Sequence, residues 1–196
     1  MQFSEIAILV MAGGSSQRFG HDDKLLAELG GLSLGLKAAT TLADFGWAQQ
    51  LVVARASLAS SFDALGYRVI GSRAGNGLGD NMALGAGALG DVAGVLIILA
   101  DMPFVTKTHV QAIVETASST ASIVCTQIHR KLMPPVLIGC DYFATLKALS
   151  GDQGAKGLFS AAGPNLVYVT APANMTADID TRQDYERALG RAKPSE

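Results

Sequence analysis

Short, continuous apolar runs alternate with longer amphipathic segments along the first half of the chain. The runs at 6–11, 51–54, 67–70 and 95–100 are typical of strands buried on both faces. The segments between them predict helices, at 34–45, 57–65 and 81–89. Repetition of strand, helix and strand favours right-handed crossovers, and therefore an α/β fold with a mostly parallel sheet covered by helices on both sides.

The alternation of predicted strands and helices continues to the end of the chain. A helix is predicted at 107–117, a turn at 129–133 and a terminal helix at 182–191; Ser57 and Thr106 are candidate N-caps. Further strands are predicted at 122–127, 135–138 and 166–170, with a helix at 142–149. Pro134 and Pro135 lack backbone donors, which predicts a strand start or a sheet edge. We find no repeat or linker, so we expect a single domain over residues 1–196.

Composition narrows the class of protein. Hydrophobic residues make up 49% of the chain and charged residues 16%, enough apolar material for one large core. A net charge of −2 argues against binding of nucleic acid through overall positive charge. The first apolar run is too short for a signal peptide or a membrane span, so we expect a cytoplasmic protein without membrane contact. Cys125 and Cys140 lack metal-ligand spacing and are expected to be buried thiols.

The first strand runs into a glycine-rich loop that has the features of a phosphate site. Gly13 and Gly14 let the backbone approach an anion, and the amides of Gly14, Ser15 and Ser16 are available as donors. Positive charge follows in the same segment, from Arg18 and Lys24. The loop matches neither the P-loop nor the dinucleotide-binding pattern. An ordinary turn with solvated basic side chains is the alternative; the combination of glycines and basic residues favours phosphate binding.

Two acidic motifs predict a metal site. Asp101 ends a buried strand at the edge of the sheet that carries the glycine loop, and Mg²⁺ is held by one or two carboxylates together with phosphate and water. Asp178 and Asp180 precede the last helix, and either is a candidate for the second ligand; we favour Asp180. Asp180 or Thr181 could instead cap that helix. A turn at 151–156, with Lys156, could receive the phosphate of an acceptor.

In order along the chain, five motifs resemble the nucleotidyltransferases of molybdenum cofactor maturation. They are MAGGSSQRFGHDDKLL, GLGDNMALGAG, LADMP, LSGDQGAKGLF and DIDTRQDY. The resemblance extends from about Ile6 to Tyr185; the first motif is common to many nucleotidyltransferases, whereas LSGDQGAK with DIDT is similar to molybdenum cofactor cytidylyltransferases. It implies a three-layer α/β/α, Rossmann-like fold of the glycosyltransferase-A type, and transfer of CMP from CTP to the phosphate of molybdopterin with release of pyrophosphate.

The resemblance also implies roles for individual residues. The nucleotide is expected at Ala12, Gly13, Gly14, Ser15, Arg18 and Lys24, with Asn81 near the base or ribose. Asp101, with Asp180, is expected to hold Mg²⁺, and Arg18, Lys24 and Asp101 are the candidate catalytic residues. The acceptor is expected at His129, Asp152, Gln153 and Lys156, and a molybdoenzyme or its chaperone is implied as the recipient of the product.

Some motifs differ from the cytidylyltransferase pattern. Asn81-Met82 stands where Ser-Leu is usual, and Met133-Pro134-Pro135-Val136 stands where His-Pro-Val is usual. The Ala-Gly-Gly loop and Asp23-Lys24 look more like guanylyltransferases, so CTP is favoured and GTP is the alternative. Other hypotheses are transfer to another small phosphorylated acceptor, a glycosyltransferase, and a nucleotide-binding module without turnover.

Overall fold

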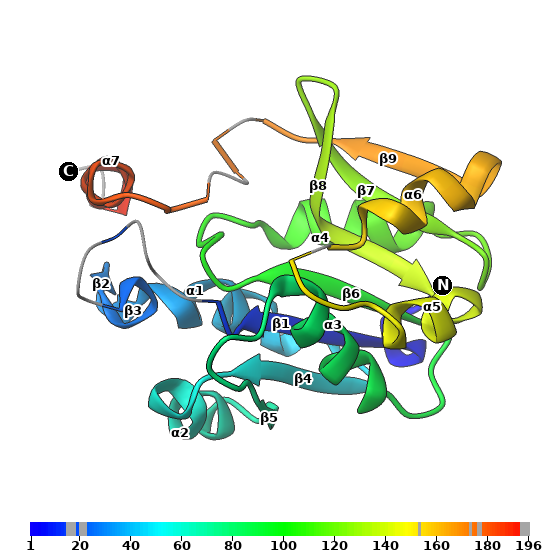
Figure 1. The fold of residues 1–196 in the computed structure, drawn as a ribbon. Helices are drawn as coiled ribbons and strands as arrows, with labels where there is room; N and C mark the ends of the chain where they lie inside the picture. The colour runs from blue at the N-terminus through cyan, green and yellow to red at the C-terminus, as the bar shows by residue number, and fades with distance from the viewer. Residues whose placement is uncertain (15–18, 20–22, 153, 173, 176–177, 193–196) are drawn as a thin grey trace.

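A seven-stranded sheet forms the centre of the computed structural model, which describes residues 1–192 except 15–18, 20–22, 153, 173 and 176–177, and not the side chains of Lys156 and Ala192 (Figure 1). The strand order is β5-β4-β1-β6-β8-β7-β9. The strands are β1 Ile6–Ala12, β4 Gln49–Ala54, β5 Arg68–Gly71, β6 Gly94–Leu99, β7 Ile123–Ile128, β8 Lys131–Gly139 and β9 Leu166–Thr170. A separate small ribbon pairs β2 (Glu28–Leu29) with β3 (Leu32–Ser33).

Most of the sheet is parallel, as the sequence predicts. β1 pairs in parallel with β4 and β6, β4 with β5, and β7 with β9. Only β8 runs antiparallel to its two neighbours, β6 and β7. The carboxyl ends of β5, β4, β1 and β6 therefore meet at one edge of the sheet, where ligands of open α/β folds bind.

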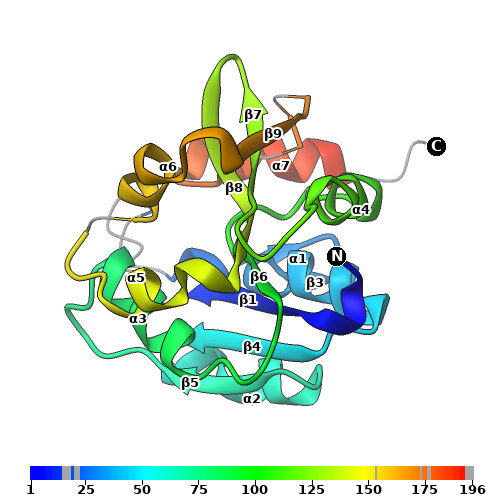
Figure 2. The same ribbon diagram turned by 90° about the vertical axis from the view of Figure 1, so that its right-hand side faces the viewer.

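Helices cover both faces of the sheet, which makes three layers. β1 is fully buried: Ile6, Ile8 and Val10 face one core, while Ala7 and Leu9 face the other. The first core is closed by α1 (Leu34–Leu42), α2 (Ala56–Ala64), α4 (Lys107–Thr116) and α7 (Arg182–Ala192). The second is closed by α3 (Leu78–Gly87), α5 (Phe143–Lys147) and α6 (Lys156–Ala162). Figure 2 shows α3, α5 and α6 on one side and α4 on the other.

Short 3-10 turns complete the helical elements: η1 Phe3–Glu5, η2 Lys24–Leu26, η3 Ala43–Phe45, η4 Cys140–Tyr142 and η5 Gly163–Asn165. Thr106 is confirmed as an N-cap, because its side chain accepts from the backbone N of His109. Ser57 is not a cap: α2 begins one residue before it, with Arg55 at the N-cap position. α3 also begins three residues earlier than predicted, at Leu78.

The expectation that Pro134 and Pro135 start a strand or lie at a sheet edge is wrong. β8 begins earlier, at Lys131, and lies between β6 and β7. The register shifts where Cys125 pairs with Val136 but Thr126 pairs with Met133, so the ladder skips both prolines. A bulge of this kind needs no backbone donor from the prolines, and it therefore admits them in an interior strand.

Of the two cysteines, Cys125 is buried, as expected, and burial raises the pKa of its thiol to about 12. Cys140 is only partly buried, and both thiols are free. Across the residues that the structure describes, no helix is long and apolar enough to cross a membrane.

His109 gives a testable pH dependence of stability. Its Nε2 lies 2.9 Å from Thr126 Oγ1, whose own proton goes to the carbonyl of Pro135, so Nε2 is the donor in this hydrogen bond. Burial lowers the pKa of His109. The unfolded chain therefore takes up a proton below about pH 6.5 that the folded protein does not take up until a lower pH.

We accordingly expect the free energy of unfolding to fall as the pH is lowered from 7.5 to 5.5, and to fall less in His109→Gln. Urea unfolding of both proteins at the two pH values measures this difference. Equal losses in both proteins would show that other groups cause the pH dependence.

Candidate functional site

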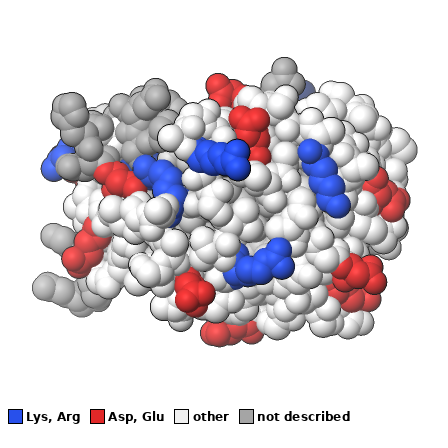
Figure 3. Space-filling model, turned by 60° about the horizontal axis from the view of Figure 1, so that its bottom comes forward, with Lys and Arg blue, Asp and Glu red and all other residues white. Residues whose placement is uncertain are grey.

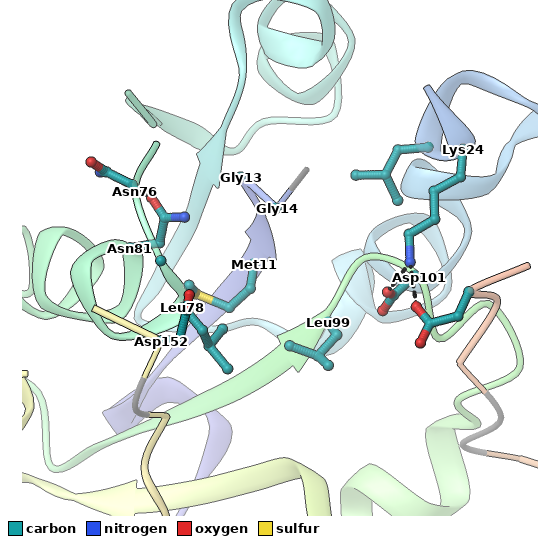
Figure 4. A pocket seen from close by; sticks show the side chains of 13 residues that line it. Met11, Gly13, Gly14, Lys24, Asn76, Leu78, Asn81, Leu99, Asp101 and Asp152 are labelled. Carbon is teal, nitrogen blue, oxygen red and sulfur yellow. Dashed lines mark hydrogen bonds and ion pairs between the residues drawn. The ribbon is translucent and has the colours of Figure 1, made fainter. Parts of the chain in front are cut away.

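A cavity of about 250 Å³ opens at the carboxyl edge of the sheet, beside the ends of β1 and β6. Its lining residues come from six segments of the chain: Met11, Gly13, Gly14, Lys24, Leu25, Asn76, Gly77, Leu78, Asn81, Leu99, Asp101, Asp152 and Asp180. Figure 4 shows a charged group at one end and the side chains of Asn76, Asn81 and Asp152 at the other, with Met11 and Leu99 between them. The cavity thus offers different chemistry at its two ends.

The charged end is built from one lysine and two carboxylates. Lys24 Nζ lies 2.7 Å from Asp101 Oδ2 and 2.9 Å from Asp180 Oδ1. The side chains of Lys24 and Asp101 are only 12% and 19% exposed, and that of Asp180 is 34% exposed. Burial lowers the pKa of Lys24, but the Asp101 and Asp180 carboxylates outweigh burial, so its pKa is raised and the ammonium stays charged.

Asp101 keeps a further oxygen available for a cation. Its Oδ1 is buried and has no hydrogen-bond partner among the described atoms. An unpaired buried carboxylate oxygen is costly, and a metal ion satisfies it well. Asp180 contacts the same ammonium, and the backbone N of Ile179 donates to the carbonyl of Asp101 at 3.2 Å. This donor set fits Mg²⁺, which uses one or two carboxylates and takes its remaining ligands from phosphate and water.

Arg55, which the sequence analysis missed, helps to fix the turn that carries Lys24 through its contact with Asp23. Asp23 Oδ1 accepts from the backbone N of Leu25 at 3.0 Å and from Arg55 Nη2 at 2.6 Å. Arg55 directly follows β4, as Gly13 follows β1. The rule that singled out Asp101, a polar residue just beyond the carboxyl end of a buried strand, would also have found Arg55.

The other end of the cavity is organised around the amide of Asn81, which is 2% exposed. Its Oδ1 accepts from Ser72 Oγ at 2.8 Å and from Asn76 Nδ2 at 3.3 Å. Its Nδ2 therefore faces Gly13, where a Cβ would lie 2.8 Å from that nitrogen. Ser72 and Asn76 were not predicted; Ser72 directly follows β5, but none of the β5 residues is fully buried, so the strand-end rule did not single it out.

A carboxylate joins the start of α3 to the turn at 151–152. Asp80 accepts from the backbone N of Gly77 and from that of Gly151, both at 2.9 Å. The backbone N of Gly79 donates to the Gly151 carbonyl at 2.7 Å. The two segments approach so closely that a Cβ on Gly77 would overlap with that carbonyl and lie 2.6 Å from Asp152 Oδ1. Asp152 is thereby held at the cavity wall.

Most of the predicted site residues lie together. Gly13, Gly14, Lys24, Asn81, Asp101, Asp152 and Asp180 line one cavity, and Ala12 is the buried end of β1 directly before it. Ser15, Arg18 and Gln153 lie outside the described residues, and Lys156 is described only by its backbone, at the start of α6. His129 does not line this cavity: it is exposed in the β7–β8 turn, which projects from the body of the protein in Figures 1 and 2.

The structure separates Asp178 from Asp180. Asp180 faces Lys24, whereas Asp178 lines a different cavity beside Phe104 and α7. The helix cap is Thr181, whose Oγ1 accepts from the backbone N of Asp184 at 3.1 Å while the Asp184 carboxylate accepts from the backbone N of Thr181. This reciprocal capping box leaves Asp180 available to the cavity.

Charge is mixed on the face of the protein that Figure 3 shows. In Figure 3, basic side chains are scattered among acidic ones over the face that is turned forward. The described part of the chain contains no group of three or more His, Cys, Asp or Glu side chains that could hold a metal ion. A cation at the charged end would therefore depend on ligands from a bound molecule as well as on the two carboxylates.

Known proteins resemble this chain over most of its length. Residues 8–166 match the MobA-like NTP transferase domain. The chain is 27% identical over 192 residues to the purine catabolism protein PucB of Bacillus subtilis, across 90% of this chain and 92% of PucB.

Solved structures share the fold. The manganese complex of Rv0371c from Mycobacterium tuberculosis H37Rv has a TM-score of 0.76 at 20% identity, over 95% of this chain and 98% of that one. The molybdopterin-guanine dinucleotide biosynthesis protein A of Archaeoglobus fulgidus has a TM-score of 0.68 at 17% identity, over 94% and 97%. The family match, which spans β1 to the start of β9 and includes Lys24 and Asp101, establishes that the chain belongs to the MobA-like NTP transferase family and is a nucleotidyltransferase.

Proposed function

We propose that this enzyme is a magnesium-dependent nucleotidyltransferase that moves CMP from CTP to the phosphate of molybdopterin. The observation that carries the reaction type is the charged group in which Lys24 contacts both Asp101 and Asp180, in the same cavity as the backbone of Gly13 and Gly14. Phosphates have donors in the loop amides and in Lys24. The base and ribose have polar partners at the opposite end, in Asn81 and Asp152.

In the proposed reaction, an oxygen of the acceptor phosphate forms a bond to the α-phosphorus of the triphosphate. The bond from that phosphorus to the bridging oxygen breaks, and both its electrons leave with pyrophosphate. Gly13 and Gly14 orient the phosphates, and Lys24 offsets negative charge that grows on the leaving group. Arg18 belongs to the same loop and is proposed to assist. Asp101 and Asp180 would hold Mg²⁺, which would supply charge neutralisation to the phosphates.

Divalent metal use is supported by two observations. The first is the buried, unpaired Oδ1 of Asp101. The second is a solved relative with the same fold that carries manganese. We propose Mg²⁺ as the working ion, because a site with two carboxylates and phosphate oxygens suits a small, hard cation.

The choice of base and acceptor rests on the sequence motifs. LSGDQGAK with DIDT favours CTP, whereas Ala-Gly-Gly with Asp23-Lys24 keeps GTP as the alternative. A molybdopterin acceptor is supported by the family and by the solved relative that is named for molybdopterin-guanine dinucleotide biosynthesis. We propose that Gln153 and Lys156 bind the acceptor. For Asp152 we now propose a role in nucleotide binding instead, because it lines the cavity together with Asn81. His129 stays a proposed acceptor contact; it is exposed on the projecting hairpin and does not line this cavity.

The test is pyrophosphate release with Mg²⁺ and each of CTP, GTP, ATP and UTP, with and without molybdenum-loaded molybdopterin. We expect acceptor-dependent release with CTP. Release with GTP instead would establish the guanylyl alternative. If no triphosphate gives release although triphosphates still bind, the molybdopterin acceptor is wrong, and other small phosphorylated acceptors become the candidates.

A further inference from the structure

Lys24 lies against the two carboxylates of the proposed metal site. Its ammonium contacts one oxygen of each of the two carboxylates that are the proposed metal ligands. We propose that Lys24 is an internal stand-in for the cation: it neutralises Asp101 and Asp180 while the site is empty of nucleotide, and it moves to the nucleotide's phosphates when a metal–nucleotide complex binds. This inference rests on the proposed metal role of the two carboxylates, and it is independent of the identity of base or acceptor.

The charges of the site favour such an exchange. Two carboxylates and one ammonium sum to −1, whereas adding a divalent cation with Lys24 still in place gives +1 in a largely buried site. A cation bound to these carboxylates would lie close to the ammonium, because Lys24 contacts Asp101 Oδ2 and Asp180 Oδ1 while the unpaired Oδ1 belongs to the same Asp101 carboxylate. Repulsion between the two cations is strong at contact distance in a poorly solvated site. The free protein should therefore hold a divalent cation weakly.

The site also provides a second position for the ammonium. The η2 turn is held by Asp23 and Arg55, so the backbone of Lys24 stays in place while its flexible side chain swings. Gly13 and Gly14 line the same cavity as Lys24. A triphosphate at these glycines presents negative charge to the ammonium. The triphosphate also brings oxygen ligands for the cation, so one binding event satisfies both.

Metal and nucleotide should consequently bind with positive coupling, and Lys24 should be the residue that creates much of it. Because coupling is reciprocal, each ligand tightens the binding of the other by the same factor. Removing the ammonium should release the metal site from competition, so that the cation binds without help from the nucleotide. The same change should weaken nucleotide binding, because the phosphates lose a partner.

The experiment measures Mn²⁺ binding to the full chain by electron paramagnetic resonance of the free ion, first without nucleotide and then with saturating CTP or GTP. For the wild-type protein we expect CTP, or GTP if that is the substrate, to lower the Kd of Mn²⁺ about tenfold or more. For Lys24→Gln without nucleotide, we expect a Kd about tenfold lower than that of the wild type. Lys24→Arg keeps the charge and should bind Mn²⁺ as weakly as the wild type.

Lys107→Gln is the matched control for loss of one positive charge. Lys107 is exposed and pairs only loosely, at 3.8 Å, with Asp44 on the surface. The Kd of the Lys107→Gln variant for Mn²⁺ should remain within about twofold of the wild-type value. The double variant Lys24→Gln with Asp101→Asn should bind Mn²⁺ more weakly than Lys24→Gln alone. This result would locate the tighter Mn²⁺ binding of the single variant at this site.

An unchanged or higher Kd in Lys24→Gln would overturn the proposal, as would an absence of coupling between Mn²⁺ and both nucleotides in the wild-type protein. If loss of the ammonium destabilises Lys24→Gln, the increase in Tm caused by Mn²⁺ is measured in place of the Mn²⁺ titration. This increase should be larger for Lys24→Gln than for the wild-type protein. Failure of the proposed function would look different: Mn²⁺ binding would respond to Lys24 as expected, while no acceptor gave pyrophosphate.

Discussion

Asp101→Asn is expected to reduce kcat/KM for pyrophosphate release by about a thousandfold, which corresponds to a loss of several kcal/mol of transition-state stabilisation. The amide has the size of the carboxylate but lacks its charge, so it holds a divalent cation poorly. Asp101 Oδ1 is buried and unpaired among the described atoms, and Oδ2 contacts Lys24. The variant therefore loses the proposed metal ligand and also weakens the contact with the lysine.

Asp178→Asn is the matched control for this prediction. Asp178 lies two residues before Asp180 but lines a different cavity, so its replacement should leave turnover within about threefold of the wild type. Asp180→Asn should behave like Asp101→Asn, with a smaller loss because its side chain is more exposed. Thermal unfolding of all three variants checks that the fold persists. Near-normal turnover in folded Asp101→Asn would contradict the metal assignment, and a large loss in Asp178→Asn would reverse the choice between the two carboxylates.

Gly77→Ala is expected to raise the KM for the nucleoside triphosphate about a hundredfold, because misplacement of a binding group by about 1 Å has effects of that size. The backbone of Gly77 has φ −76°, so alanine adopts it without strain. The added methyl group would overlap with the Gly151 carbonyl, which is backbone and cannot rotate away. The turn at 151–152 must then move, and both Asp152 and the start of α3 move with it.

Gly87→Ala tests whether the effect comes from this contact. Gly87 lies in the same helix, and a Cβ there meets no atom within 4 Å. Alanine is the better helix former, so this variant should be slightly more stable and should bind the nucleotide normally. A KM for Gly77→Ala within a few-fold of the wild-type value would show that the 151–152 turn does not shape the nucleotide site.

Strand positions were predictable because buried strands of a parallel sheet leave a strong local signal. β1 and β6 lie within one residue of the runs at 6–11 and 95–100. Continuous apolar character on both faces is what two covering layers of helices require. The β2–β3 ribbon was missed because each of its strands has only two residues. Pro134 and Pro135 misled the interpretation because a bulge depends on pairing across the sheet, which local sequence does not encode.

The residues of the candidate site likewise fall into two groups, those that the sequence identified and those whose contacts only the tertiary structure revealed. By itself the sequence determined which residues end the buried strands, and so it identified Gly13, Gly14 and Asp101 from strand ends and Lys24 from the same loop. The sequence favoured Asp180 over Asp178, but the contact of Asp180 with Lys24, the contact of Arg55 with Asp23 in the Lys24 turn and the place of Asp152 in the cavity with Asn81 came from the tertiary structure alone. Each of these depends on contacts between segments 30 or more residues apart. Local patterns fix which face of an element a side chain occupies, but only the packed fold fixes which charge or amide lies opposite.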